Sequence, residues 1–262
     1  MSDTQAGASN LTNTEEKRNL WSIKAHSGAR YMTVLRQFHT YLKPRTYLEI
    51  GVNEGASLNL ATCASIAIDP KFDFKTPLLT NKEICLFYQM TSDDFFRRFD
   101  PNEIFRSKID LAFLDGMHWF EFLLRDFINV EKHCARNSVV VLHDCIPLDE
   151  HAGRRLQEDS SLREFSNHKS HWAGDVWKTI AILKKYRSDL RIVALDAPPT
   201  GLVCITNLNP SSNVLSERYF EIVREFSDFS LARHGDEYMK QLNLNGTNMV
   251  ATSDAMSAQF WL

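Results

Sequence analysis

The chain has 262 residues, a net charge of −3, 44% hydrophobic residues and 24% charged residues, which is typical of a globular protein. No cluster of Lys and Arg rises above the background, so we expect no nucleic-acid partner. No run reaches the roughly 18 consecutive apolar residues that a membrane span needs, so we expect no membrane partner.

The N-terminal residues and the cysteines indicate where the protein works. Residues 1–20 have little apolar content, so we expect them to be disordered or frayed. They also lack the apolar core of a signal peptide. The five cysteines are odd in number and widely spaced, without a C-x-x-C pair. This pattern favours a reducing cytoplasm over secretion.

The apolar pattern predicts a helix within 21–42, which Pro44 ends, and then alternating strands and helices up to about residue 206. The predicted strands are 46–50, 65–69, 83–88, 109–114, 138–142, 191–195 and 201–206. Helices are predicted at 56–63, from Ser92, at 119–134 and at 174–187, with an amphipathic helix at 217–226 before the pattern fades.

Continuous apolar strands of this kind are buried on both faces, as in a parallel sheet covered by helices. The sequence therefore predicts an α/β fold with a single doubly wound, mostly parallel seven-stranded sheet. We expect the main domain to span 21–210 with its N-terminal helix, and a helical or irregular C-terminal extension, 211–262, to pack on it.

The strongest local signal is the segment 46–58, in which an apolar strand ends at Glu49 and is followed by a turn with Gly51 and Gly55. A second strand ends at Asp69, where an acid is placed to accept hydrogen bonds from ribose hydroxyls. This arrangement predicts a nucleoside cofactor that contacts Glu49, Gly51, Gly55 and Asp69.

The turn lacks the three glycines of the dinucleotide fingerprint, because Val52 and Asn53 stand where the second glycine would help. A carboxylate beside the turn would repel a pyrophosphate but suits a positively charged ligand. S-adenosylmethionine carries an ammonium and a sulfonium and no phosphate, so the charge favours it.

The segments YLEIGVNEGASL and AIDP resemble the first two motifs of the class I S-adenosylmethionine-dependent methyltransferases, and the resemblance extends from about Arg45 to Asn207. It implies the Rossmann-like methyltransferase fold with S-adenosyl-L-methionine as cofactor. It also implies that Ser92 or Asp93, after the third strand, contacts the adenine amino group. Both residues could equally cap the helix that starts there.

The segment Phe113–Phe120 resembles the D-G-x-H-x-Y segment of a small-molecule methyltransferase subgroup related to the catechol O-methyltransferase-like enzymes. The resemblance implies Asp115 and Asp144 as ligands of a divalent metal, with Asp115 also next to the cofactor. Cys145 stands where the amide ligand of those enzymes would be, and a thiol argues against Mg²⁺.

His118 and His143 lie beside these two acids in the sequence. Either could be the catalytic base that takes a proton from an acceptor hydroxyl, or a ligand of a softer ion such as Mn²⁺, Fe²⁺ or Zn²⁺. A structural role is the third alternative for His118. Trp172, Trp177 and Lys178 could wall the acceptor pocket, and the long segment 147–171 could be a lid.

Together these features predict methyl transfer from S-adenosylmethionine to a small-molecule acceptor, at a hydroxyl. The alternatives are a nicotinamide-dependent oxidoreductase on the same sheet and a cofactor-binding scaffold without catalysis. An iron-dependent hydroxylase is disfavoured by the βα rhythm. The sequence leaves the oligomeric state open. The N-terminal helix and the amphipathic tail are candidate interfaces of a homo-oligomer.

Overall fold

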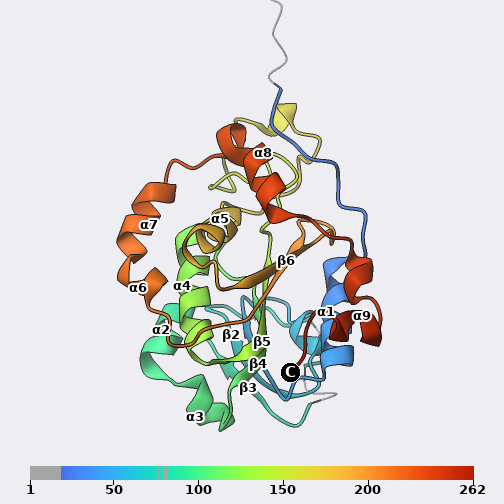
Figure 1. Cartoon of the computed structure of the whole chain (residues 1–262), viewed down its shortest axis with the longest axis vertical. Coiled ribbons are helices and arrows are strands. Elements are labelled where there is room, and N and C mark those ends of the chain that lie inside the picture. The colour runs from blue at the N-terminus through green and yellow to red at the C-terminus, as the bar shows by residue number, and fades with distance from the viewer. Residues whose placement is uncertain (1–18, 76, 79–81) are drawn as a thin grey trace, which may run out of the picture.

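The computed structural model describes residues 19–75, 77–78 and 82–262. A seven-stranded sheet runs through the centre of the molecule with the strand order β3-β2-β1-β4-β5-β7-β6 (Figure 1). The strands are β1 (Thr46–Ile50), β2 (Ala64–Ile68), β3 (Cys85–Tyr88), β4 (Ile109–Leu114), β5 (Cys134–His143), β6 (Arg191–Leu195) and β7 (Leu202–Thr206).

Strands β1 to β5 are parallel to one another, whereas β7 is antiparallel to both β5 and β6. This confirms the doubly wound, mostly parallel sheet that the sequence predicts. The strand order reverses between β1 and β4, and ligands of such sheets bind at that point, outside the carboxyl ends of the strands.

Helices cover both faces of the sheet (Figure 1). One face carries α4 and α5 with the later helices α7 and α8, and the other carries α1 and α9. The helices are α1 (Tyr31–Leu42), α2 (Ser92–Arg98), α3 (Pro101–Phe105), α4 (Phe120–Lys132), α5 (Trp177–Tyr186), α6 (Val214–Glu217), α7 (Tyr219–Phe226), α8 (Leu231–Leu242) and α9 (Ser253–Ser257).

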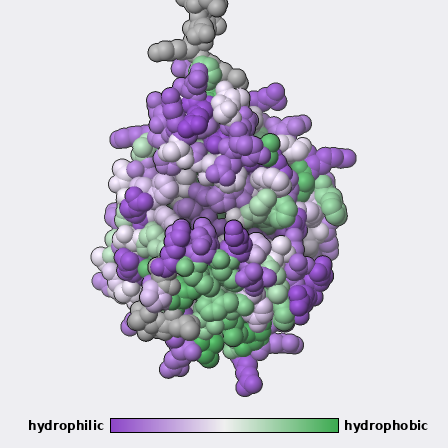
Figure 2. All heavy atoms as spheres, turned by 180° about the vertical axis from the view of Figure 1, so that it is seen from behind, coloured by the Kyte–Doolittle hydropathy of each residue, from purple (hydrophilic) through white to green (hydrophobic). Residues whose placement is uncertain are grey.

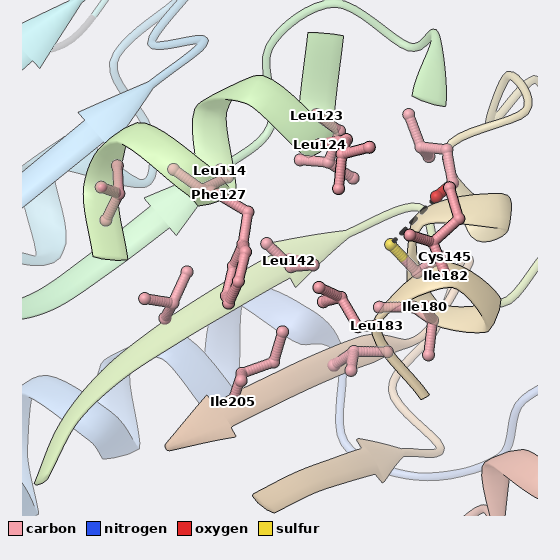
Figure 3. Close-up of a cluster of buried hydrophobic side chains, with 14 of the residues drawn as sticks. Leu114, Leu123, Leu124, Phe127, Leu142, Cys145, Ile180, Ile182, Leu183 and Ile205 are labelled. Carbon is pink, nitrogen blue, oxygen red and sulfur yellow. Dashed lines mark hydrogen bonds between the residues drawn. The ribbon is translucent and has the colours of Figure 1, made fainter. Parts of the chain in front are cut away.

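Apolar side chains fill the space between the sheet and these helices. Figure 3 shows Phe127 of α4 lying over Leu142 of β5 and Ile205 of β7, with Ile180 and Leu183 of α5 alongside. All five side chains are fully buried. Because both faces are covered in this way, every residue of β1, β4 and β7 is buried, which explains their continuous apolar runs.

The predicted helix at 56–63 is wrong: the structure has only a short 3₁₀ helix there, Leu58–Leu60. The Leu58 carbonyl accepts hydrogen bonds from the Ala61 amide at 3.2 Å and the Lys82 ammonium at 2.6 Å. Ala61 is already extended, so the chain enters β2 without another helical turn.

The two ends of the described chain also differ from the predicted pattern. The first helix begins at Tyr31, and residues 19–30 run extended against the segment after β5, where the Ile23 amide donates to the Leu148 carbonyl. Beyond residue 226, where the apolar pattern fades, the chain forms α8 and α9. Trp21 packs directly on Gly235 of α8, which leaves no room for a larger residue there.

The prediction of disorder for residues 1–20 concerns mainly residues 1–18, which lie outside the described residues. Among the described residues, none of the helices combines the length and the apolar character that crossing a membrane requires.

Candidate active site

The turn after β1 is packed tightly against the end of β4. Gly51 has a φ of +86°, and a Cβ there would lie 2.0 Å from the Asp115 carbonyl oxygen. The Asp115 amide donates to the Ile50 carbonyl, which holds the two strand ends together. Only glycine fits position 51, because the positive φ is unfavourable for any residue with a side chain and there is no space for a Cβ.

Asp69, at the end of β2, supports the same turn. One of its carboxylate oxygens accepts from the Asn53 amide at 2.8 Å and the other from the Lys71 amide at 2.7 Å. The residue is only 8% exposed. These bonds orient a carboxylate whose remaining lone pairs can accept further hydrogen bonds.

A cavity of about 550 Å³ lies at the carboxyl ends of β1, β2 and β4, within the usual range of small-molecule sites. The predicted residues Gly51, Asp69, Ser92, Asp93, Asp115 and His118 all line it. Four carboxyl groups line the cavity, and its described lining includes no Lys or Arg. Such a lining suits a cationic ligand and opposes a pyrophosphate. The carboxyl groups are those of Asp69, Asp93, Asp115 and Asp126.

The start of α2 and the middle of α4 form one end of this cavity. Asp93 is paired with Arg125 through two nitrogens of the guanidinium, at 2.9 and 2.7 Å. Asp126 is buried, and burial raises its pKa to about 7 although a hydrogen bond from Ser92 acts in the opposite direction. Thr91, rather than Ser92 or Asp93, caps α2 by accepting from the Asp94 amide.

Glu49 and Gly55 lie outside the lining of this cavity. Glu49 is fully buried and accepts hydrogen bonds from the Tyr47 hydroxyl at 2.6 Å and the Ser57 hydroxyl at 2.5 Å. Burial raises its pKa to about 7, against those two hydrogen bonds. Gly55, with a φ of +81°, lies against Leu78. Their contact with a cofactor therefore stays a prediction, and the structure gives each of them a role in the turn.

Asp115, His118 and Asp144 form a compact cluster at the ends of β4 and β5, with one ligand atom from each within 4.8 Å of the others. His118 Nε2 lies 3.7 Å from Asp115 Oδ1 and 3.4 Å from Asp144 Oδ2. A cavity of about 10 Å³ lies among these three residues, and this is roughly the volume of one water-sized sphere.

His143, the last residue of β5, lies against both carboxylates of the cluster. Its Nδ1 lies 3.1 Å from Asp115 Oδ1 and 3.4 Å from Asp144 Oδ2. Burial alone would lower the His143 pKa, but the carboxylates of Asp144 and Asp115 outweigh burial and hold it well above the usual value. His143 Nε2 is buried and has no hydrogen-bond partner among the described residues.

Two aromatic rings flank the histidines. Tyr31, the first residue of α1, lies over His143 with ring centroids 4.3 Å apart. Trp172 stacks on His118 at 4.9 Å. Of the other predicted wall residues, Trp177 is 1% exposed and packs in the core, and Lys178 is buried with its ammonium on the Ser227 carbonyl.

Cys145 does not take part in the cluster. Its Sγ lies 3.2 Å from the His143 carbonyl and 3.9 Å from the Val176 carbonyl, and Figure 3 shows the thiol directed toward the latter, among core side chains. The residue that joins the two acids is instead His118. Asp144 adopts a φ of +58° and accepts a hydrogen bond from the Thr200 hydroxyl.

The segment 147–171 is bound to the body of the protein. The Arg155 guanidinium pairs with Glu121 at 2.8 Å and Asp175 at 2.9 Å. Trp119 and Trp172 donate their indole N–H groups to the carbonyls of Arg155 and Arg154. The lid motion suggested by its length stays a prediction.

Sequence reasoning missed Asp126 and Tyr31. Asp126 lies within the apolar stripe of α4, and an acid among apolar positions of a predicted helix was the signal that could have revealed it, although Glu131 of α4 is a second buried acid. Tyr31 had no such signal, because only the packing of α1 against the end of β5 brings its ring to His143.

A family model described as a methyltransferase domain matches residues 48–145, from β1 through the cluster at the end of β5. A comparison with curated proteins finds no match. The chain is similar to several solved structures at low identity, and none of these similarities informs the choice of acceptor.

For three of these structures, the sequence identity, coverage and TM-score are as follows. The O-methyltransferase TomG from Streptomyces achromogenes, involved in tomaymycin synthesis and solved with SAM, is 15% identical over 68% of this chain and 79% of its own, with a TM-score of 0.45. Cofactor-bound Rv0187 from MTB is 13% identical over 72% and 84%, with a TM-score of 0.48. The O-methyltransferase from Bacillus cereus, solved with SAH, is 12% identical over 70% and 84%, with a TM-score of 0.45.

Proposed function

We propose that this chain, a class I S-adenosylmethionine-dependent methyltransferase, methylates a hydroxyl of a small-molecule acceptor beside the cluster of Asp115, His118 and Asp144. One observation carries the proposal. Asp115 and His118 line both the 550 Å³ cavity and the 10 Å³ cavity, so a cofactor in the first would lie next to the acidic cluster.

The larger cavity fits S-adenosylmethionine, which supplies a methyl group on a positively charged sulfur. Asp69 would accept the ribose hydroxyls, and Gly51 allows a close approach of the ligand to the backbone. Ser92, Asp93 and the carboxyl of Asp126 lie together at one end, where the adenine amino group would need an acceptor. A pyrophosphate would face the carboxylates of Asp69 and Asp115 without a basic residue in the described lining, which argues against a nicotinamide cofactor. Asp93 is already paired with Arg125, and Asp126 has a pKa of about 7, so these two add less negative charge.

The cluster fits a divalent cation. Ligand atoms 2.0–2.2 Å from a common ion lie about 3–3.5 Å apart, close to the separation of His118 Nε2 from the two carboxylates. Asp115, His118 and Asp144 would hold the ion. An imidazole among the ligands favours Mn²⁺, Zn²⁺ or Fe²⁺ over Mg²⁺. The ion would stabilise the deprotonated form of an acceptor hydroxyl.

The residues of the chain then have distinct tasks. The Nδ1–H of His143 faces both carboxylates and keeps them oriented. The rings of Tyr31 and Trp172 fix the two imidazoles from outside. Holding acceptor oxygen, methyl carbon and sulfur in line can remove about 7–11 kcal/mol of the barrier. Without an ion, His118 is the group placed to take the acceptor proton.

Binding experiments test this proposal without knowledge of the acceptor. We expect S-adenosylhomocysteine to bind with micromolar affinity by isothermal titration calorimetry, and one Mn²⁺ per chain to be detected by electron paramagnetic resonance. Asp144→Asn should weaken Mn²⁺ binding at least tenfold and leave S-adenosylhomocysteine binding nearly unchanged. His168→Ala, in the segment 147–171, is the matched control and should change neither.

The outcomes separate the alternatives. S-adenosylhomocysteine binding without any Mn²⁺, Zn²⁺ or Mg²⁺ binding would reject the metal and leave His118 as the base. Cofactor binding with no methyl transfer across a panel of phenols, sugars and hydroxy acids would indicate the scaffold alternative. Absence of S-adenosylhomocysteine binding at millimolar concentration would reject the proposal as a whole.

A further inference from the structure

The two edge strands of the sheet, β6 and β3, differ in whether another segment pairs with them. At the β6 edge, Asn245 forms a parallel bridge with Leu195: its amide donates to the Ala194 carbonyl at 2.9 Å and its carbonyl accepts from the Asp196 amide at 2.8 Å. The C-terminal extension therefore covers this edge. At the other edge, β3 pairs only with β2 among the strands of the sheet.

The outward-facing backbone groups of β3 are those of Cys85 and Phe87. The Ile84 carbonyl accepts from the Ser65 amide of β2 at 3.1 Å, and the Tyr88 carbonyl accepts at 3.2 Å from the amide of Asp69, which directly follows β2. In a parallel pair alternate residues bond to the same neighbour, so the residues between point their N–H and C=O groups away from the sheet. Within the described part of the chain, neither Cys85 nor Phe87 has a partner on that side.

The side chains of this edge are apolar and exposed. Residues 84–90 carry no charge, and Ile84, Leu86 and Phe87 are 53%, 38% and 38% exposed. Phe74, 42% exposed, stacks against Phe87 with ring centroids 5.2 Å apart. Figure 2 shows apolar side chains gathered on the lower half of the face seen from behind, the end of the molecule where Figure 1 places β3.

An exposed, apolar and unpaired edge strand is uncommon, because it recruits other strands. Natural proteins block such edges with Lys, Pro, bulges or a covering segment, as this chain does at β6. Neither Lys nor Pro occurs in 84–90. The apolar edge therefore has the features of an interface.

We propose that β3 pairs antiparallel with β3 of a second copy of this chain, about a two-fold axis at Leu86. Cys85 of each copy would then face Phe87 of the other, and the four outward N–H groups of the two copies would find the four outward C=O groups. Leu86 of one copy would face Leu86 of the other at a non-hydrogen-bonded position, where side chains come closest. This proposal is independent of the reaction.

A second copy is the occupant that these observations favour. The edge is self-complementary, as a two-fold interface requires, and its lack of charge gives no electrostatic selection for a different protein. The exposed parts of the four apolar side chains amount to roughly 300 Å² per copy, judged from the area that such side chains bury. For two copies this is about 600 Å², below the roughly 1,200 Å² at which standard interfaces begin, so the dimer should be weak and reversible.

The self-facing position of Leu86 gives a sharp test by analytical ultracentrifugation. We expect the full chain to show a concentration-dependent monomer–dimer equilibrium. Leu86→Lys and Leu86→Glu, each alone, should raise the dimer dissociation constant at least 100-fold, because like charges would face each other across the axis. An equimolar mixture of the two variants should dimerise again. Phe220→Lys, on α7 and 85% exposed, is the control and should leave the dimer intact.

A second measurement covers the case in which the Leu86 variants fold poorly. Amide hydrogen exchange of Cys85 and Phe87 in the unmodified chain should slow at least tenfold between low micromolar and 100 µM protein. A chain that stays monomeric at 100 µM, or a dimer in which these amides exchange at an unchanged rate, would overturn the proposal. Failure of the Lys–Glu mixture to reassociate while both variants remain folded would do the same.

Discussion

At the scale of single residues, Asp115 connects the two halves of the site. It lines the 550 Å³ cavity, belongs to the cluster with His118 and Asp144, and its backbone carbonyl fills the space that a side chain at position 51 would need. Its carboxylate also holds His143 at 3.1 Å. A change at Asp115 would disturb all of these contacts, so neighbouring residues with one role each are better probes.

Asp69 is such a probe for the cofactor. Asp69→Asn should weaken S-adenosylhomocysteine binding about tenfold to 100-fold, because hydrogen bonds to a charged group contribute roughly 1.5–3 kcal/mol. Calorimetry on the purified variant checks this. Asp73→Asn, on the same connection but 63% exposed in its side chain, should bind like the unmodified chain. Equal affinity for Asp69→Asn would remove Asp69 from the site.

Glu49 gives a prediction about pH. Its folded-state pKa of about 7 lies above the ordinary 4.5, so its contribution to stability is fully present below pH 4.5 and is lost as the pH rises through 7. Glu49→Gln cannot ionise. The unfolding free energy of the variant, relative to the unmodified chain, should therefore increase by about 1–3 kcal/mol from pH 5 to pH 8.

Urea unfolding at a series of pH values measures this difference. Glu54→Gln, which removes a carboxyl that is 48% exposed in its side chain, is the control and should show a nearly flat difference. A difference for Glu49→Gln that stays constant with pH would mean that Glu49 is ionised in the folded protein.

At the scale of elements, the turn between β1 and β2 is the least tolerant part of the site. Gly51→Ala would place a methyl group against the Asp115 carbonyl at a φ of +86°, so the backbone must move. We expect a loss of about 2–4 kcal/mol in unfolding free energy and a loss of S-adenosylhomocysteine binding. Gly246→Ala, where φ is negative and the nearest atom belongs to the Asn248 side chain, should be tolerated.

Most strands and the longer helices could be predicted from the sequence because their apolar runs reflect burial in this fold; β3 is the exception, since its apolar residues are exposed or half-buried at the edge of the sheet. The predicted 46–50, 109–114 and 191–195 agree with β1, β4 and β6 at both ends. The missed helix α8 has a sparse buried stripe, Leu231, Tyr238 and Leu242, and contains Gly235, which has poor helix propensity. Its glycine is explained only by the packing of Trp21, a contact 214 residues away.

At the scale of the whole molecule, the two apolar layers on either side of the sheet hold the strand ends in place. Phe127→Ala would leave a cavity between α4, β5 and β7 in the layer that Figure 3 shows, and should cost about 3–5 kcal/mol of unfolding free energy. Thermal or urea unfolding measures the loss. Phe220→Ala, on the surface of α7, should cost less than about 0.5 kcal/mol.

The same scale limits what the sequence could tell about the site. That Asp115 and Asp144 lie together follows from adjacent parallel strands, which the βα rhythm predicts. That His118 rather than Cys145 joins them depends on how the chain leaves β5, where Asp144 takes a positive φ and directs the thiol into the core. The placement of Tyr31 depends on the docking of α1 and is not written in any local pattern.

The most direct test of the central claim is a crystal structure of the protein with S-adenosylhomocysteine and Mn²⁺, with anomalous data collected at the manganese edge. We predict the nucleoside in the cavity bounded by Gly51, Asp69 and Asp115, and one anomalous peak bounded by Asp115, His118 and Asp144. A nucleoside bound elsewhere, or a site filled by the nucleoside with the three ligand side chains turned away from any ion, would contradict the account.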